Sequence, residues 1–315
     1  YPDSTNAYAT SFTIAKSATE PQFPSVSSVN NYIHWRPYAD EFYASKKDID
    51  FTIFNDSTHL AGDIKLEPSG LSGSGRMDLK NSEIVSDNFT YEADEIFADT
   101  SDFYLKSLHT TGFTVLTENV KSHISYKEQK GYFNSNEDFT LVNFPENRYI
   151  SYLDYFIWDM NKKEMAMGSK KQLQAEQPEV SEDEEPIGPT YISMHPQQDS
   201  LSFISPLAYY DYQDNLIKAT DVKYIDVADA RIYPDEGNVV VEQDARIRPL
   251  ENARVKANML TKHHLFHSAN INIYGRKSYD GLGNYDFEDE YGKIQNIHFK
   301  QIEVDENLQT IASGE

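Results

Sequence analysis

Residues 62–79 read Gly-Asp-Ile-Lys-Leu-Glu-Pro-Ser-Gly-Leu-Ser-Gly-Ser-Gly-Arg-Met-Asp-Leu. Apolar side chains recur in this stretch at every second position, at Ile64 and Leu66 and again at Met77 and Leu79. The same alternation continues through residues 89–93, and Gly, Pro, Asn or Asp interrupts it every six to twelve residues. A period of two, broken by turn-forming residues, is typical of short strands with one buried face.

Comparable strand patterns follow along most of the chain, and no amphipathic helix of more than two or three turns can be drawn. The pattern is strictest towards the end, for example in Ala253-Arg-Val-Lys-Ala-Asn and Ala269-Asn-Ile-Asn-Ile-Tyr. Pro234-Asp-Glu-Gly-Asn238 predicts a hairpin-type turn into Val239. The sequence therefore predicts an all-β fold.

Similar strand units recur at intervals of roughly 20 to 25 residues, a spacing typical of repeat architectures. If the units stack, the chain forms an elongated β-solenoid or a taco-like stack of short strands. A β-sandwich built from the same strands is the alternative.

The composition suits thin, half-exposed sheets better than a deep aliphatic core, because 22 Tyr and 17 Phe supply much of the 39% hydrophobic content. Lys and Arg number 28 against 51 Asp and Glu, which gives a net charge of −23. That charge repels phosphate backbones and argues against nucleic-acid binding. The absence of cysteine excludes disulfides and zinc–thiolate sites.

Four regions can be distinguished along the chain. Residues 1–60 predict an irregular lead-in, and residues 61–169 predict a β-repeat region. Residues 170–189 end in a run of acids and predict a flexible linker, after which residues 190–315 predict a second β-repeat region. We also expect a segment of a longer protein, because the chain opens on Tyr1 without Met and stops within a strand pattern. No apolar run is long enough to span a membrane.

Several stretches resemble known envelope proteins. Residues 89–167 and 201–260 carry the form "strand, Tyr-Asp or Tyr-Lys turn, strand", for example in 122–133 and 208–222. This form resembles the OstA-like strands of lipopolysaccharide-transport proteins, where V-shaped hairpins stack into an open taco. Residues 61–75 look like repeats of the AsmA group. Residues 196–203, 227–235 and 279–287 resemble long envelope or secreted β-repeat proteins of Bacteroidota. These resemblances imply a cell-envelope location and a scaffold or lipid-handling role, without catalytic residues to transfer.

The sequence predicts no cofactor, although residues 280–290 supply oxygen ligands that would suit calcium. The carboxylates and amides alternate with glycines that permit a tight loop, although the spacing departs from that of an EF-hand. Two strands joined by Gly-containing turns would account for the same residues without a metal ion. The candidate ligands are Asp280, Asn284, Asp286 and Asp289, with Glu288 and Glu290 beside them.

Two other groups were weighed as sites. His263, His264 and His267 could bind zinc if they lay on a helical turn, but in an extended strand His263 and His267 are about 13 Å apart. Asp99 and Asp102 could flank a glycosidic bond, yet with 51 acids such pairs arise by chance. Neither pattern predicts a site, because histidines that line a turn and acids paired by chance explain the same residues.

The sequence thus favours a non-enzymatic β-repeat segment of a larger bacterial cell-envelope protein, acting as a scaffold or as an amphiphile-binding groove. Its expected partners are other segments of the same protein, other envelope proteins, or a lipid or glycan. The alternative is a β-helix module that binds or degrades glycans, with tyrosines as stacking platforms.

Overall fold

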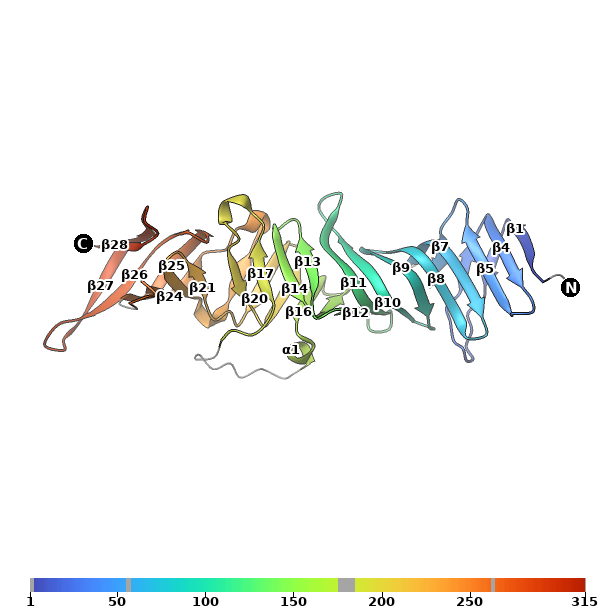
Figure 1. Ribbon diagram of the computed structural model, residues 1–315, viewed down its shortest axis with the longest axis horizontal. Helices are drawn as coiled ribbons and strands as arrows, with labels where there is room; N and C mark the ends of the chain where they lie inside the picture. Colours follow the sequence, from blue (N-terminus) through green and yellow to red (C-terminus); the bar gives the residue numbers. More distant parts are fainter. Residues whose placement is uncertain (1–2, 55–57, 175–184, 262–263, 315) are drawn as a thin grey trace. The chain divides into compact units, whose positions relative to one another are not determined.

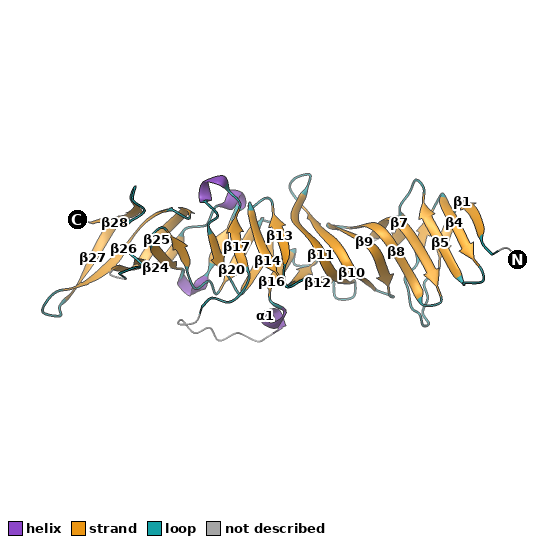
Figure 2. Ribbon diagram, viewed as in Figure 1, coloured by secondary structure: helices purple, strands orange, loops and turns teal. Residues whose placement is uncertain are grey.

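The computed structural model describes residues 3–54, 58–174, 185–261 and 264–314. Strands dominate these residues (Figure 2). Helical structure among them is confined to α1 (Lys170–Gln174) and to short 3-10 turns at Pro196–Gln198, η2 (Asp235–Gly237) and Gln243–Ala245. The all-β prediction is confirmed.

The chain divides into two compact units, each described here by itself. Unit 1 comprises Tyr1–Thr140 and Ile157–Lys163, and unit 2 comprises Leu141–Phe156 and Glu164–Glu315. The predicted linker, 170–189, begins in α1 and ends just before a strand that starts at Thr190. Its central residues, 175–184, lie outside the described residues, so the prediction of flexibility there stays a prediction.

The expectation of an irregular lead-in over residues 1–60 is wrong for the residues described there. They form strands whose inward side chains, such as Val26, Ala44 and Phe51, are fully buried. The apolar stretches are too short to predict strands alone, but pairing with β7 (Thr58–Glu67) buries them. The strands are β1 (Thr5–Ala9), β2 (Phe12–Ile14), β3 (Val26–Ser28), β4 (Asn31–Arg36), β5 (Glu41–Lys46) and β6 (Phe51–Ile53).

Antiparallel pairing runs through unit 1 in the order β1–β4–β5–β7–β8–β9–β10–β11–β12. A second run, β2–β3–β6, pairs with β7 as well. Along one edge of β7, residues 58–60 pair with β6 and residues 63–66 pair with β5. The further strands are β8 (Gly70–Leu79), β9 (Ser82–Tyr91), β10 (Glu95–Lys106), β11 (Phe113–Ser125) and β12 (Lys130–Ser135).

In the long strands the alternation of buried and exposed residues shifts by one position near the middle. In β9 the buried positions are Ser82, Ile84 and Ser86, and then Phe89 and Tyr91, with an exposed pair of residues between the two sets. Strands β10 and β11 carry equivalent exposed pairs, at 99–100 and 118–119. The pairing registers of β8 with β9 and of β10 with β11 shift at the same places. Bulges of this kind bend a strand, so each long strand contributes two arms, one on either side of the bend.

Small residues permit close contact at the bend. A Cβ atom on Gly62 would lie 1.8 Å from the carbonyl oxygen of Ser74. Gly75 has φ +123°, a conformation that side chains rarely adopt, and its Cβ would lie 2.5 Å from the carbonyl oxygen of Ala61. Gly62 and Gly75 lie opposite each other in the register, and both are therefore required by the close approach of β7 and β8.

Buried hydroxyls satisfy backbone groups that the bulges release. Ser86 Oγ donates to the carbonyl oxygen of Thr100 at 2.7 Å. Ser101 Oγ lies 3.0 Å from the carbonyl oxygen of Val120 and 3.0 Å from Ser122 Oγ. Carbonyl groups that lose their ladder partners need such replacements when they are buried.

Replacing Ser101 by Ala tests this role. We expect Ser101→Ala to lower the free energy of unfolding by about 1–3 kcal/mol, because a buried carbonyl loses a donor. Thr100→Ala is the matched control, since the Thr100 side chain is exposed, and it should cost less than about 0.5 kcal/mol. Urea unfolding followed by tryptophan fluorescence measures both, and equal costs would contradict the assigned role.

The arms of unit 1 pack on each other. Phe103, in one arm, and Phe133, on β12 in the other arm, have ring centroids 4.3 Å apart. Trp158, on β15 (Tyr155–Asp159), lies 5.6 Å from the Phe103 ring. A Cβ on Gly73 would lie 3.2 Å from Leu60 Cδ2, which is another contact across the bend. Side chains from both arms therefore fill the interior.

The first part of unit 2 has a tyrosine-rich core. Strand β14 pairs with β17 and β17 with β18, while β16, β19, β20 and β23 pair in series. Four fully buried tyrosines, at 149, 191, 210 and 212, lie among these strands and their turns. The bounds are β13 (Thr140–Phe144), β14 (Tyr149–Leu153), β16 (Glu164–Gly168), β17 (Thr190–Ser193), β18 (Ser202–Ile204), β19 (Leu207–Asp211), β20 (Leu216–Thr220) and β23 (Val239–Val241).

These phenols predict alkaline unfolding. Burial raises the pKa values of Tyr149 and Tyr191 far above their ordinary value. The folded state keeps both protonated where the unfolded chain, with a pKa near 10, releases the protons. The stability is therefore complete below about pH 10 and falls above it, by up to about 1.4 kcal/mol per pH unit for each tyrosine. Denaturant unfolding at pH 8 and pH 11 measures the loss; Tyr149→Phe should make it shallower, and an unchanged slope would contradict the assignment.

The second part of unit 2 is a seven-stranded antiparallel sheet in the order β21–β22–β24–β25–β26–β27–β28. Small and β-branched residues such as Ala230, Ile232, Ala253 and Val255 form its buried face. The strict alternation predicted near the C-terminal end is thus confirmed for residues 253–257 and 269–273. It is wrong for residues 297–304, where Ile302 is the one buried side chain. The strands of this sheet are β21 (Ile225–Val227), β22 (Ala230–Tyr233), β24 (Leu250–Ala257), β25 (His264–Gly275), β26 (Ser278–Glu288), β27 (Ile294–Val304) and β28 (Thr310–Gly314) (Figure 1).

Candidate functional site

The outer face of the seven-stranded sheet carries a compact group of cations and tyrosines. Because alternate residues of a strand face opposite sides, the buried Ala230 and Ile232 place Arg231 and Tyr233 outward on β22. In the same way Arg254 and Lys256 point outward from β24. The registers set Arg231 opposite Lys256, and Tyr233 opposite Arg254. Two neighbouring cross-strand rows therefore bring three cations and a phenol together.

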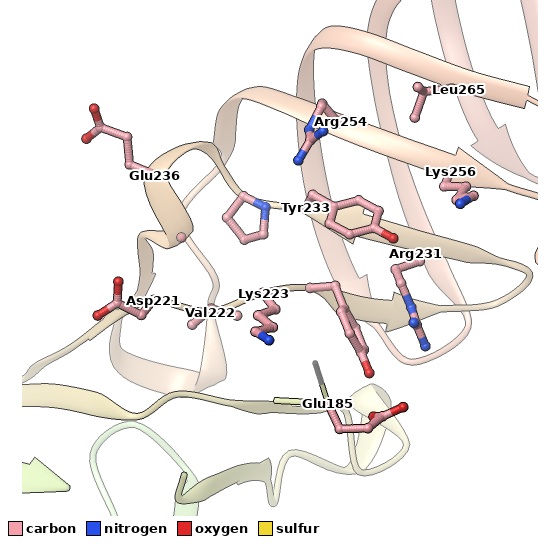
Figure 3. Close-up of a pocket in the computed structure, with 13 residues that line it drawn as sticks. Glu185, Asp221, Val222, Lys223, Arg231, Tyr233, Glu236, Arg254, Lys256 and Leu265 are labelled. Carbon is pink, nitrogen blue, oxygen red and sulfur yellow. The ribbon is translucent and has the colours of Figure 1, made fainter. Parts of the chain in front are cut away.

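A hollow with a volume of about 610 Å³ lies over these rows. Figure 3 shows the side chains from β22 and β24 on one side of it and the segment Asp221–Lys223 with Glu236 on the other. This volume is in the range of small-ligand sites, about 300–1,000 Å³. The described residues that line it are Glu185, Asp221, Val222, Lys223, Tyr224, Arg231, Tyr233, Pro234, Glu236, Gly237, Arg254, Lys256 and Leu265.

Arg231 is held rigidly at one end of the hollow. Its Nε and Nη2 atoms donate to the two carboxylate oxygens of Asp226 at 2.8 and 3.0 Å. Its guanidinium also stacks over the Tyr224 ring, 3.5 Å from the centroid. The Asp226 carboxylate raises the pKa of Arg231 above its ordinary value, and partial burial raises the pKa of the Tyr224 phenol. Both groups keep their ordinary charge at neutral pH.

Tyr233, Arg254 and Lys256 continue the cationic side. The Arg254 guanidinium lies 5.3 Å from the centroid of the Tyr233 ring. Within the described part of the chain, Lys256 has no ion-pair partner. A strongly hydrated ammonium that lines a hollow in this way is a ready point charge for an anion.

The opposite side depends on a glycine. The Val222 N–H donates to the carbonyl oxygen of Gly237 at 3.0 Å. Gly237, in η2, has φ +69°, and a Cβ there would lie 2.9 Å from Asp221 Cα. No other residue type allows this approach without displacement, so Gly237 permits the backbone of η2 to lie against Asp221 and Val222.

The arrangement is suited to binding. Neither histidine nor serine occurs among the described lining residues. Arginine and lysine recognise carboxylates through charge-assisted hydrogen bonds, and the phenols present both a ring and a hydroxyl. The chemistry that these groups support is recognition of a small polar anion.

The calcium candidates are distributed along β26 and the turn that follows it. Asp280 accepts from Asn272 Nδ2 at 2.8 Å and from Tyr274 OH at 3.0 Å. Asn284 Oδ1 lies 2.9 Å from His298 Nδ1. The extended strand separates Asp280 from Asn284 by about 13 Å at ~3.3 Å per residue.

The remaining candidates also have separate roles. Asp286 accepts from Asn296 Nδ2 at 2.7 Å, and this bond, together with His267, lowers the pKa of Asp286. Asp289 accepts from the backbone N–H groups of Tyr291 and Lys293 and so closes the turn. The four candidates are not brought together, and no group of three or more metal-binding side chains occurs within the described ranges.

The histidine and paired-acid candidates lie elsewhere in the structure. His263 is outside the described residues, while His267 Nε2 lies 3.4 Å from Asp286. Asp99 pairs with Lys121 at 2.7 Å, and Asp102 accepts from the Asn119 N–H at 3.1 Å, both at the bend of unit 1. These acids thus stabilise the bulges in the observed structure.

No protein-family model, curated protein or solved structure was found to match this chain. None of the helices described here has the length and apolar character that crossing a membrane requires.

Proposed function

We propose that this chain is a non-enzymatic scaffold segment of a larger bacterial cell-envelope protein, built as a taco-like stack of bent strands. The observation that supports it most is the bend shared by successive strands of unit 1. In an aligned sandwich the two sheets are made from different strands. Here β7 to β11 each contribute residues to both arms, as expected for stacked V-shaped hairpins.

The scaffold role is favoured over an amphiphile-binding groove in unit 1. A groove for lipid tails needs an apolar space between the arms. Phe103 and Phe133 meet across that space with ring centroids 4.3 Å apart, and both are fully buried. Energy gained by filling the interior stabilises the stack itself.

Stacked strands also offer a way to connect to other segments. Strand β1 forms the outer end of the ladder, paired with β4, and most of its residues are exposed. Outer strands present backbone groups that a further strand can pair with. The proposed partner is therefore another β-rich segment of the same envelope protein.

Site-specific photo-crosslinking in the native bacterium tests this proposal. A benzophenone amino acid in place of Tyr8, on β1, should crosslink to a strand segment in the envelope fraction. The matched control is Tyr38, which lies outside the strands and is more exposed, 71% against 48% for Tyr8. Recovery in the cytosolic fraction, or equal crosslinking from both positions, would contradict the scaffold role.

A further inference from the structure

The hollow on the outer face of unit 2 differs in charge from the rest of the chain. Acids outnumber basic residues 51 to 28 overall, but four of the lining residues are Lys or Arg and three are acidic. Figure 3 shows Asp221 and Glu236 at one end, and Arg231 and Lys256 at the other, with Lys223 between these ends and Glu185 towards Arg231.

We propose that this hollow binds a carboxylated sugar, such as a uronic acid within an oligosaccharide. Arg254 and Lys256 would hold the carboxylate, since both point outward from β24 into the hollow. The acids at the opposite end would accept hydrogen bonds from sugar hydroxyls. The site is independent of the scaffold role proposed for unit 1.

The lining favours a sugar over other anions. A peptide would bring apolar side chains, whereas Val222, Pro234 and Leu265 are the apolar non-aromatic side chains among the described lining residues. Inorganic phosphate or polyphosphate would bring negative charge without the sugar hydroxyls that can donate to the carboxylates of Asp221 and Glu236. A ring with one carboxylate and several hydroxyls matches both ends.

Preorganisation supports the same ligand. Asp226 and Tyr224 fix the Arg231 guanidinium before any ligand arrives, so little side-chain entropy remains to be lost there. Arg231 therefore supplies a fixed positive charge next to Lys256, which lies opposite it in the register.

Isothermal titration calorimetry of the full chain with trigalacturonic acid tests the proposal. Neutral galactotriose is the matched probe without charge, and we expect its binding to be at least about tenfold weaker. Lys256→Gln and, separately, Arg254→Gln should each weaken trigalacturonate binding by about tenfold. Arg246→Gln removes a cation that is 71% exposed and lies outside the hollow, and should leave the affinity unchanged.

Three results would overturn the proposal: no heat of binding with the acidic trimer, equal affinity for the neutral trimer, or equal weakening by Arg246→Gln. Inorganic phosphate at the same concentration separates sugar recognition from simple anion binding. Displacement of the trimer by phosphate at equal concentration would also refute it. Circular dichroism spectra of every variant must match that of the parent chain, and Tyr233→Leu gives an independent test if a charge variant does not fold.

Discussion

Gly62→Ala is expected to prevent unit 1 from folding. The added Cβ would lie 1.8 Å from the carbonyl oxygen of Ser74. The Ser74 carbonyl carbon at 2.9 Å and Gly75 Cα at 3.0 Å leave no space into which the Cβ could shift. The paired strands β7 and β8 would have to separate there. We expect a loss of more than about 4 kcal/mol in the free energy of unfolding, the range of the most damaging single substitutions. Tryptophan fluorescence reports on this unit alone, because both tryptophans, Trp35 and Trp158, belong to it.

Asp63→Ala is the control for that experiment. Asp63 is the next residue of β7, and its side chain is exposed. Its replacement should change the free energy of unfolding by less than about 0.5 kcal/mol. A folded Gly62→Ala protein with parent-like fluorescence and melting would show that the two strands do not approach each other as closely as described.

Phe103→Ala is expected to cost about 3–5 kcal/mol, as for other buried aromatic residues. The ring is fully buried and lies against Phe133 and Trp158. Phe133 comes from the opposite arm. Its removal leaves a cavity that the packed strands cannot close, because both arms are held by backbone pairing. Urea unfolding monitored by Trp158 emission measures the loss.

Tyr104→Ala is the comparison within the same strand. Tyr104 follows Phe103 and faces the other side of β10, where it is only partly buried and contacts Phe113. We expect a cost of about 1 kcal/mol or less from this change. If both substitutions cost the same, the face of β10 assigned to the interior would be wrong.

The strands themselves were predictable because alternation is local. Ile64, Met77 and Phe89 are all buried, and each was marked by its position in a two-residue period. The bend was not predicted, although the sequence carries its signal. Exposed polar pairs such as Asp87-Asn88 interrupt the alternation by one residue, which is the trace of a bulge.

Strand partners could not be predicted, because they depend on contacts between distant residues. Pro234-Asp-Glu-Gly-Asn238 was predicted as a hairpin turn, and η2 does lie there. The strands on either side, however, belong to different sheets, since β22 pairs with β21 and β24, whereas β23 pairs with β20. A turn signal gives the change of direction, but it does not determine which strand comes next.

The cationic hollow was missed for the same reason. Arg231, Arg254 and Lys256 occupy the outward-facing positions of alternating strand patterns that can be read from the sequence. Only the register of β22 with β24 places them side by side. The calcium candidates show the converse: Asp280, Asn284 and Asp286 are close in sequence, but an extended strand spreads them apart.

The central claim is that bent strands bring two arms of unit 1 into contact, and the Phe103–Phe133 pair tests it most directly. Nuclear Overhauser spectroscopy on protein labelled selectively at phenylalanine, with Phe103→Leu used for assignment, detects ring protons closer than about 5 Å. The ring centroids lie 4.3 Å apart, so a strong cross-peak is expected, and it should vanish in the Leu variant. Absence of that cross-peak from the folded parent protein would contradict the bent, packed stack and the scaffold role built on it.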